Sequence, residues 1–230
     1  MLRQPFFNEI EAATADARQR LEHTPAIERC LDGQVEMQTY QAFLAEAYHH
    51  VKHTVPLLMA CGSRLPERLE WLREAIVHYI EEEVGHQEWI LNDIQNLGGD
   101  RESVRQGKPS LPTELMVSYA YDTVARGNPV ALFGMVYALE KTSSTIATYA
   151  ASQIVSALDL SPKAMSYMVS HGSLDIEHMQ DFEKLMNRLE DEDDKAAVLH
   201  SAAVFYELYS NIFAALPLTA DHPEESSHAA

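Results

Sequence analysis

The segment HGSLDIEHMQ, residues 171–180, holds three side chains of the types that bind metal ions. His171, Asp175 and His178 follow one another at spacings of four and three residues. An α-helix turns by about 100° per residue, so these spacings bring all three side chains back to one face, about one turn apart. If the segment is helical, that face offers two imidazoles and one carboxylate to metal ions.

A second candidate pair lies in HYIEEEVGHQEW, residues 78–89. Glu83 and His86 stand three residues apart, so on a continuous helix they share one face. Glu-x-x-His is the local motif from which di-iron sites are built in helical bundles. Glu82 lies four residues before His86 and is an alternative to Glu83, which we prefer as the ligand. The motif is weak alone, because Glu and His are also common on exposed helix faces.

Glu140 interrupts the apolar segment NPVALFGMVYALEK, residues 128–141. On a helix it shares a face with Val136 and Tyr137, and burial of a carboxylate there is costly unless it is paired or bound to metal. The other interpretation is that Glu140 and Lys141 mark the solvent edge of this helix. Together with the two segments above, Glu140 completes a set of three carboxylates and three imidazoles. That set suits iron or manganese, whereas a structural zinc site is usually rich in sulfur.

A rival group lies in AEAYHHVKHTVP, residues 45–56, which contains Glu46, His49, His50 and His53. It has a Glu-x-x-His motif of its own and could bind a metal ion. We consider a pocket-lining role for Tyr48, His49 or His53 the better interpretation.

Apolar residues recur with helical spacing through nearly the whole chain, which contains only nine glycines. No alternating strand pattern is present. The pattern predicts an all-α, single-domain bundle of about seven helices over residues 1–218, followed by a polar, disordered tail at 219–230. The expected helices cover residues 5–22, 36–61, 65–97, 112–126, 129–157, 161–190 and 193–216.

Composition excludes several classes of partner. The formal net charge of −18 and the pI of about 4.9 argue against binding to nucleic acids or to an anionic membrane surface. No apolar segment has the character of a signal peptide or the length of a membrane span, so we expect a cytoplasmic protein. Cys30 and Cys61 stand in apolar helical segments and are expected to be reduced core residues. Helical spacing makes core packing the expectation for Phe133, Tyr137, Phe205, Tyr206, Tyr209 and Phe213.

The order of these segments resembles the haem-oxygenase-like fold, which is shared with the TenA thiaminases and the pyrroloquinoline quinone synthase. EHTPAIERCLDGQVEMQTYQAFLAEAYHHVKH, residues 22–53, looks like the opening of that superfamily, and the resemblance covers roughly residues 20–215. Within it, the chain is similar to the haem-oxygenase-like di-iron oxidases, in which a Glu and His pair, a lone later Glu and H-x3-D-x2-H furnish six ligands. The corresponding residues here are Glu83, His86, Glu140, His171, Asp175 and His178.

The resemblance implies a centre of two Fe(II) ions, with manganese as an alternative at one site and O2 as the co-substrate. The substrate would be a small organic molecule, either a fatty acid or a compound derived from an amino acid. Glu140 would bridge the ions, Glu83 and His86 would hold one, and the 171–178 triplet would hold the other. The resemblance also implies a homodimer. Because all six candidate ligands lie on helices of one chain, each site is expected inside one protomer. An external electron donor is compatible with this chemistry.

A metal-free TenA-like protein for pyrimidine salvage or binding is the alternative function on the same fold. A TenA-type thiaminase needs an activated cysteine, and neither Cys30 nor Cys61 has residues nearby in sequence that would lower a thiol pKa. A haem oxygenase needs a proximal histidine on its first helix. His23 is the one candidate, and we interpret it as structural.

Overall fold

The described part of the chain, residues 4–218 of this computed structural model, contains helices and no strand; the side chains of Pro162, Ser173 and Leu174 are not described. The predicted all-α class is therefore correct, while the predicted tail at 219–230 lies outside the described residues. The elements in chain order are α1 (Phe6–Glu22), α2 (Pro25–Leu31), α3 (Met37–Val51), α4 (Thr54–Arg64), η1 (Glu67–Leu69), α5 (Glu70–Glu83), α6 (His86–Asn96), α7 (Arg101–Gln106), α8 (Leu111–Arg126), η2 (Pro129–Ala131), α9 (Leu132–Leu158), η3 (Pro162–Ala164), α10 (Ser166–Met186) and α11 (Glu192–Ala214), where η marks a short 3₁₀ helix.

The number of helices is larger than predicted because two expected helices are broken. The segment 36–61 divides into α3 and α4 at Lys52 and His53. The segment 65–97 divides into α5 and α6, because Val84 is extended and Gly85 adopts a left-handed conformation with φ 97°. Glycine reaches this conformation without steric cost, since it has no Cβ. The short helices α2 and α7 were not predicted; Asp100 caps α7 by accepting hydrogen bonds from the backbone N–H groups of residues 102 and 103.

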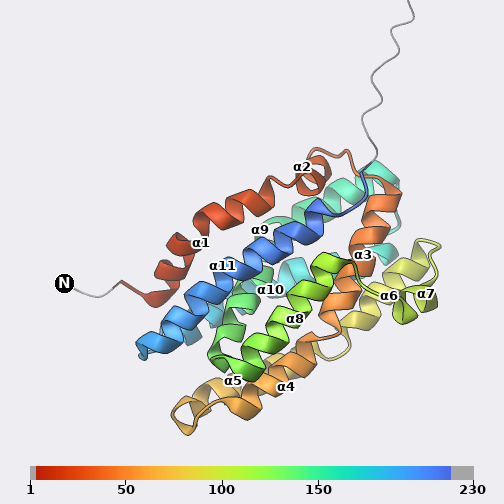
Figure 1. The fold of residues 1–230 in the computed structure, drawn as a ribbon. Coiled ribbons are helices and arrows are strands. Elements are labelled where there is room, and N and C mark those ends of the chain that lie inside the picture. The colour runs from red at the N-terminus through yellow and green to blue at the C-terminus, as the bar shows by residue number, and fades with distance from the viewer. Residues whose placement is uncertain (1–3, 219–230) are drawn as a thin grey trace, which may run out of the picture.

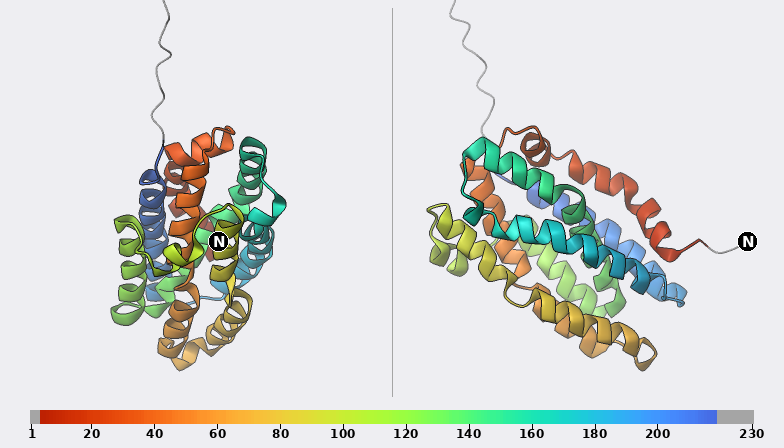
Figure 2. Two further views of the ribbon diagram at one scale, coloured as in Figure 1. Left: turned by 90° about the vertical axis from the view of Figure 1, so that its right-hand side faces the viewer. Right: turned by 180° about the vertical axis from the view of Figure 1, so that it is seen from behind.

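The three longest helices form the centre of the bundle. α9 packs against both α10 and α11, and α1 lies along α11 at one edge (Figure 1). Seen from behind, α10 runs between α1 and the α5–α6 pair (Figure 2). Two glycines permit close contact: a Cβ on Gly134 would lie 2.5 Å from the backbone N of Ala202 on α11, and one on Gly172 would lie 2.6 Å from Thr148 Oγ1 on α9.

The apolar interior consists of two clusters with a gap between them. On α9 the larger cluster ends at Ala138 and the smaller begins at Ala147. On α10 the smaller cluster includes Met168, and the larger resumes at Met179. The polar residues that the sequence marks as metal ligands on these two helices fall inside this gap. Core packing is confirmed for all six aromatic residues considered above, which belong to the larger cluster: Phe133, Tyr137, Phe205, Tyr206, Tyr209 and Phe213.

A buried carboxylate joins three segments at one end of the bundle. Asp194, in the first turn of α11, is 1% exposed and accepts hydrogen bonds from Arg68 at 2.6 and 3.2 Å. Its Oδ1 also accepts a hydrogen bond of 2.8 Å from the side-chain amide of Asn128, just before η2. Burial opposes ionisation of this carboxyl, but the Arg68 and Asn128 hydrogen bonds outweigh it and lower the pKa of Asp194.

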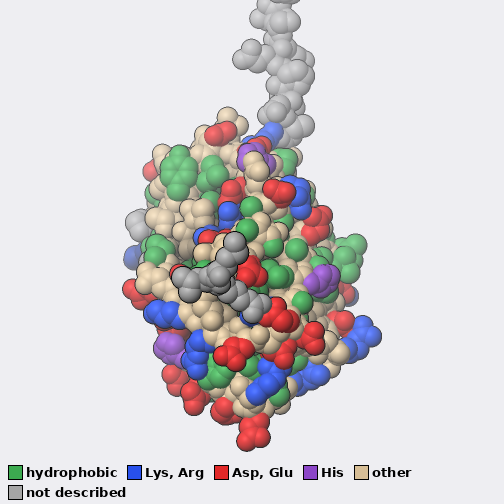
Figure 3. Space-filling model, turned by 90° about the vertical axis from the view of Figure 1, so that its left-hand side faces the viewer, with side chains coloured by type: hydrophobic (Ala, Val, Ile, Leu, Met, Phe, Trp, Pro, Cys, Tyr) green, Lys and Arg blue, Asp and Glu red, His purple; other side chains and the backbone are tan. Residues whose placement is uncertain are grey.

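The surface is mixed in charge on the face that contains the N-terminal end of α1. Asp and Glu side chains are interspersed there with Lys and Arg (Figure 3). None of the described helices combines the length and the apolar character needed to cross a bilayer.

Candidate metal centre

All six residues predicted as metal ligands meet inside the bundle, in two groups of three that are buried or nearly so. Within each group, one ligand atom from every residue lies within 4.8 Å of those of the other two. The groups are Glu83, His86 and His171, and Glu140, Asp175 and His178. This division differs from the expected one, because His171 joins the first pair. It lies one helical turn before Asp175, where α10 faces α6, and its ring stands edge-on to that of His86 at 4.8 Å between centroids.

Glu83 and His86 are brought together by the turn that separates α5 from α6, and not by a position on one continuous helix. Glu83 is the last residue of α5 and His86 the first residue of α6. The left-handed Gly85 between them turns the chain so that Glu83 Oε2 lies 3.2 Å from His86 Nδ1. Their exposed fractions are 8% and 2%, so both side chains point into the bundle. The predicted pairing is present, although the predicted continuous helix is wrong.

The second group joins α9 to α10. His178 Nδ1 lies 3.5 Å from Asp175 Oδ1 and 3.6 Å from Glu140 Oε1. Two ligand atoms each about 2.0–2.2 Å from one ion lie about 2.8–3.6 Å apart at ordinary coordination angles. The two separations from His178 therefore fit ligands of one ion, and the atoms of Asp175 and Glu140 lie within 4.8 Å of one another. Of the two interpretations of Glu140, the solvent-edge one is wrong, because this side chain is only 12% exposed.

Several buried polar atoms of this centre have no hydrogen-bond partner among the described residues. They are Glu140 Oε2, His171 Nε2, Asp175 Oδ1 and both ring nitrogens of His178. Buried polar atoms in proteins are nearly always hydrogen-bonded, so a concentration of unpaired donors and acceptors in one place requires a partner. Metal ions would supply that partner for the carboxylate oxygens, for His171 Nε2 and for one ring nitrogen of His178. A set of carboxylate oxygens and imidazole nitrogens without sulfur suits iron.

Protons take part in the charge balance of these groups. Burial raises the pKa of Glu140 to about 8. Burial alone would lower the pKa of His178, but the carboxylates of Asp175 and Glu140 beside it raise that pKa to about 11. Burial works against ionisation of Asp175, and His171 and His178 outweigh it and lower its pKa. A metal ion that binds here therefore displaces protons from the imidazoles.

A buried aspartate fixes the start of α10 against α6. Asp93, on α6 two turns after His86, is 0% exposed. Its carboxylate accepts hydrogen bonds from the backbone N–H of Ser166 at 3.0 Å, from the Ser166 hydroxyl at 2.7 Å and from the backbone N–H of Tyr167 at 2.8 Å. These are the first two residues of α10, whose free N–H groups need acceptors. Asp93 thereby sets the position of His171, one turn further along α10, relative to His86.

Aromatic rings that the sequence analysis did not identify cover the imidazoles. Tyr79 stands four positions before Glu83, Tyr167 stands four positions before His171, and Trp89 stands three positions after His86. Helical spacing from the predicted ligands could therefore have identified all three rings. The centroid distances are 4.0 Å for Trp89 to His86, 4.8 Å for Tyr167 to His171 and 5.7 Å for Tyr79 to His178. These rings shield the imidazoles from water and restrict their rotation.

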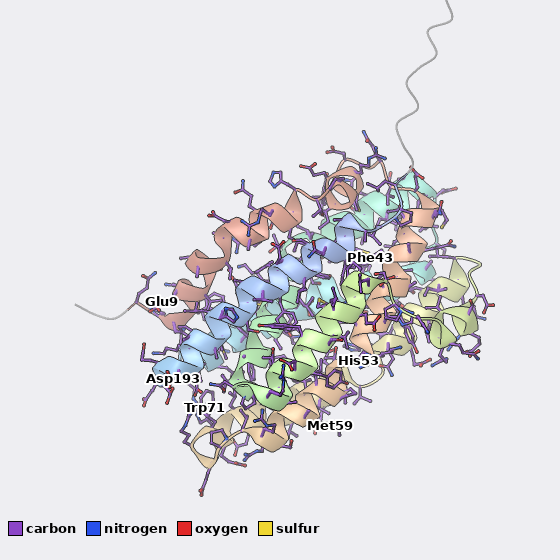
Figure 4. All side chains as sticks on the ribbon, viewed as in Figure 1. Glu9, Phe43, His53, Met59, Trp71 and Asp193 are labelled. Carbon is purple, nitrogen blue, oxygen red and sulfur yellow. The ribbon has the colours of Figure 1, made fainter. Side chains whose placement is uncertain are left out.

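The rival group in the segment 45–56 does not assemble into a metal site, because its members have separate partners. Glu46 accepts hydrogen bonds from the backbone N–H and the hydroxyl of Ser110, at the start of α8. His49 Nδ1 lies 3.2 Å from Lys52 Nζ. His53, at the junction of α3 and α4 (Figure 4), lies 3.0 Å from the hydroxyl of Tyr121.

His50 is the member of that group that reaches the candidate metal centre. It lines a cavity of about 80 Å³ together with Glu83, Glu140, His171 and Asp175. Its Nδ1 lies 2.9 Å from the backbone carbonyl of residue 46, and because a carbonyl can only accept, Nδ1 must carry the hydrogen. Burial lowers the pKa of His50 to about 4, so the ring is neutral and its Nε2 is a hydrogen-bond acceptor. The residues expected from the sequence to take this pocket-lining role were its neighbours Tyr48, His49 and His53.

An apolar pocket of about 100 Å³ adjoins the metal cavity. It lies between α2, α3, α9, α10 and α11, and extends along α9 from Thr142 to Ile154, about 18 Å of helix. None of the described residues that line it is Asp, Glu, Lys or Arg. Phe43 on α3 (Figure 4) stacks on Phe213 of α11 at 5.8 Å and forms part of the wall. The wall shared with the metal cavity consists of Ser143, Tyr167, His171 and Tyr209.

The cysteines and His23 do not provide the centres that the alternative functions need. Both cysteines are free thiols. Burial raises the pKa of Cys30 to about 11 and that of Cys61 to about 12, opposite to an activated nucleophile. Cys61 is a core residue as expected, whereas Cys30 is half-buried and lines the apolar pocket. His23 is exposed at the end of α1, with Nδ1 2.7 Å from the backbone carbonyl of Gln19.

The fold and the two groups of ligands define an all-helical protein with a candidate site for two metal ions. Residues 41–210 match the family of iron-containing redox enzymes, and this match covers more than half of the chain. The chain therefore belongs to that family. A comparison with curated proteins gives no significant match.

Solved structures show the same fold. A domain of unknown function with a haem-oxygenase-like fold from Shewanella denitrificans is 28% identical, with a TM-score of 0.79 over 93% of this chain and 91% of that one. A TenA homologue from Pseudomonas syringae is 12% identical, with a TM-score of 0.77 over 90% of both chains. Haem oxygenase-1 from the cyanobacterium Synechocystis, in complex with haem, is 13% identical, with a TM-score of 0.72 over 91% of both chains. The resemblance to the haem-oxygenase and TenA fold is confirmed.

Proposed function

We propose that this protein is an O2-dependent, non-haem di-iron oxidase that oxidises a small organic substrate. The observation that carries the proposal is the pair of buried ligand groups with unpaired polar atoms, in a chain that belongs to a family of iron-containing redox enzymes. Bound as Fe(II), the ions would supply electrons to O2 and the oxidising power for an unactivated bond.

The residues of the chain have distinct roles in this proposal. Glu83, His86 and His171 would hold one ion, and Asp175 and His178 would hold the other. Glu140 belongs to the second group by distance. It is also the one ligand from α9, which makes it the candidate to bridge the two ions. The aromatic rings over the imidazoles exclude water from the centre.

The cavity between the ligand groups has the donors and acceptors to hold the reacting end of a substrate. The neutral His50 offers Nε2 as an acceptor to a hydroxyl, an amine or a water molecule there. The adjoining apolar pocket favours the fatty-acid alternative over a compound derived from an amino acid, because the charged groups of an amino acid would lie unpaired against that wall. The alkyl part would occupy the pocket, with the polar end at the shared wall.

Assembly and electron supply are further parts of the proposal. All six candidate ligands come from one chain, so each protomer holds a complete site, and we expect two protomers to form a homodimer. A substrate that supplies only part of the electrons needed to reduce O2 to water requires an external electron donor.

Anaerobic reconstitution tests the proposal. Metal-free protein is titrated with Fe(II) under argon, desalted and analysed for iron, then mixed with O2 while the optical spectrum is recorded. We expect about two iron ions per chain and a spectral change on addition of O2. Glu140→Ala and His171→Ala should each lower the iron content, while Glu81→Ala, at an exposed position on α5, should not. Wild-type protein that retains no iron, or ligand variants that retain as much as wild type, would refute the assignment.

A further inference from the structure

We infer that Glu82 is a positioning residue for the candidate metal centre, because it holds the ring of His178 from the side opposite to the ion. This inference rests on the proposed function, since it requires an ion in the group of Glu140, Asp175 and His178. It also gives distinct roles to Glu82 and Glu83, the two adjacent carboxylates that the sequence offered as alternative metal ligands.

The two nitrogens of His178 face different surroundings. Nδ1 is directed at Asp175 and Glu140, at 3.5 and 3.6 Å, and is the nitrogen that can share an ion with them. Nε2 lies 3.2 Å from Glu82 Oε2, at the end of α5. The side chain of His178 is only 7% exposed, so water has little access to Nε2.

Metal binding at one nitrogen of a neutral imidazole leaves a hydrogen on the other, and a buried N–H needs an acceptor. A carboxylate in that place fixes the tautomer, orients the ring and makes the ligating nitrogen more basic. Glu82 is the carboxylate within reach. The contact is not yet aligned as a hydrogen bond, which is common at sites before their ligand binds.

The position of Glu82 separates it from the ligands themselves. It lines a hollow of about 290 Å³ between α5 and α10, whereas Glu83 lines the metal cavity. Tyr79 lines both spaces, and His178 lines the hollow. Because Nε2 of His178 faces Glu82 while Nδ1 faces Asp175 and Glu140, Glu82 lies across the imidazole from the carboxylates of the group. Its Oε1 lies 3.3 Å from Nε2 of the exposed His78, which helps to keep the carboxylate in place.

Three variants test this role: Glu82→Ala, Glu82→Gln and the exposed control Glu81→Ala. Iron binding to each is measured under argon against a competing chelator, together with the melting temperature of the iron-free protein. Loss of an orienting partner of a ligand typically costs 10–100-fold in metal affinity, and we expect this loss at one of the two sites in Glu82→Ala. Glu82→Gln should retain most of the affinity, because the amide oxygen accepts the same hydrogen bond. All three iron-free variants should melt like wild type, since among the described residues the buried partner of Glu82 is His178.

Two results would overturn the inference and leave the proposed function intact. If Glu82→Gln loses as much iron as Glu82→Ala, Glu82 acts as a metal ligand and not through a hydrogen bond. If Glu82→Ala holds both ions as tightly as wild type, the contact with His178 has no role. Wild-type protein that binds no iron would instead refute the proposed function, so the two failures are distinguishable.

Discussion

Replacement of Asp93 by alanine should weaken the fold by about 3 kcal/mol. The substitution removes the carboxylate that accepts three hydrogen bonds at the start of α10. It leaves two backbone N–H groups and one hydroxyl without an acceptor. Such bonds contribute about 0.5–1.5 kcal/mol each when neutral and about 1.5–3 kcal/mol each with a charged partner. The lower range applies, because burial outweighs the hydrogen bonds and raises the pKa of Asp93, so its charge is poorly stabilised. Three bonds of about 1 kcal/mol give the estimate.

Urea denaturation of the iron-free protein, followed by circular dichroism, measures this change. We expect Asp93→Ala to lower the midpoint with an unchanged slope, and to lower the melting temperature by roughly 6–12 °C for a chain of this size. Asp93→Asn keeps an oxygen for the two bonds from Ser166 and removes a charge that burial disfavours, but its NH2 group cannot accept from the Tyr167 N–H. With one bond lost, it should cost about 1 kcal/mol, clearly less than Asp93→Ala. Asp100→Ala is the matched control: this exposed aspartate caps α7, and its loss should cost about 1 kcal/mol or less.

The outcome can refute the reasoning in two ways. A loss below about 1 kcal/mol in Asp93→Ala would mean that water replaces the carboxylate, and that the start of α10 does not depend on it. An equal loss in Asp93→Asn would mean that the charge of Asp93 matters, contrary to the direction of its pKa shift.

Three further predictions concern metal, acid and the cavity. Fe(II) at a hundredfold excess over its dissociation constant should stabilise the wild-type protein by about 2.7 kcal/mol per site, which differential scanning fluorimetry under argon detects as a higher melting temperature; an unchanged temperature would count against metal binding. Because the pKa of Asp194 is lowered in the folded state, its contribution to stability is present above the unfolded pKa of about 3.9 and is lost as pH falls through the folded value. The difference in unfolding free energy between wild type and Asp194→Asn should therefore be largest at pH 7 and shrink towards pH 3, and a difference independent of pH would contradict this. His50→Leu should leave the iron content unchanged, because His50 belongs to neither ligand group; a loss like that of His171→Ala would make His50 a ligand.

The fold class and the six candidate ligands were accessible from the sequence because both depend on local information. Helical periodicity reports which face of a segment is buried, and residue type reports which side chains bind metal. The spacing of His171, Asp175 and His178 on one helix is of this kind, and α10 is indeed continuous across them.

Contacts between distant segments were not accessible in this way. The union of His171 with Glu83 and His86 depends on where α6 lies against α10, and the role of Asp93 depends on residues more than seventy positions away. The break at Gly85 left a weak signal, a single glycine without a proline, which helices tolerate at a modest cost. His50 was noticed only as one of several histidines, since its orientation follows from packing against α11 through Tyr209.

Because Glu83 and His86 lie on two different helices, α5 and α6, the number of residues between them does not have to match the periodicity of a helix. An extra residue inside a helix would rotate every later side chain by about 100°, and would carry a ligand away from its partner. At Val84 and Gly85 the chain is not helical, Val84 is 65% exposed, and nothing lies within 4 Å of the place where a Cβ on Gly85 would be. Insertions there can be absorbed by the backbone while Glu83 and His86 keep their separate helices. The length of this junction can therefore drift during evolution at little cost, and related proteins that keep the metal pair need not keep the Glu-x-x-His motif.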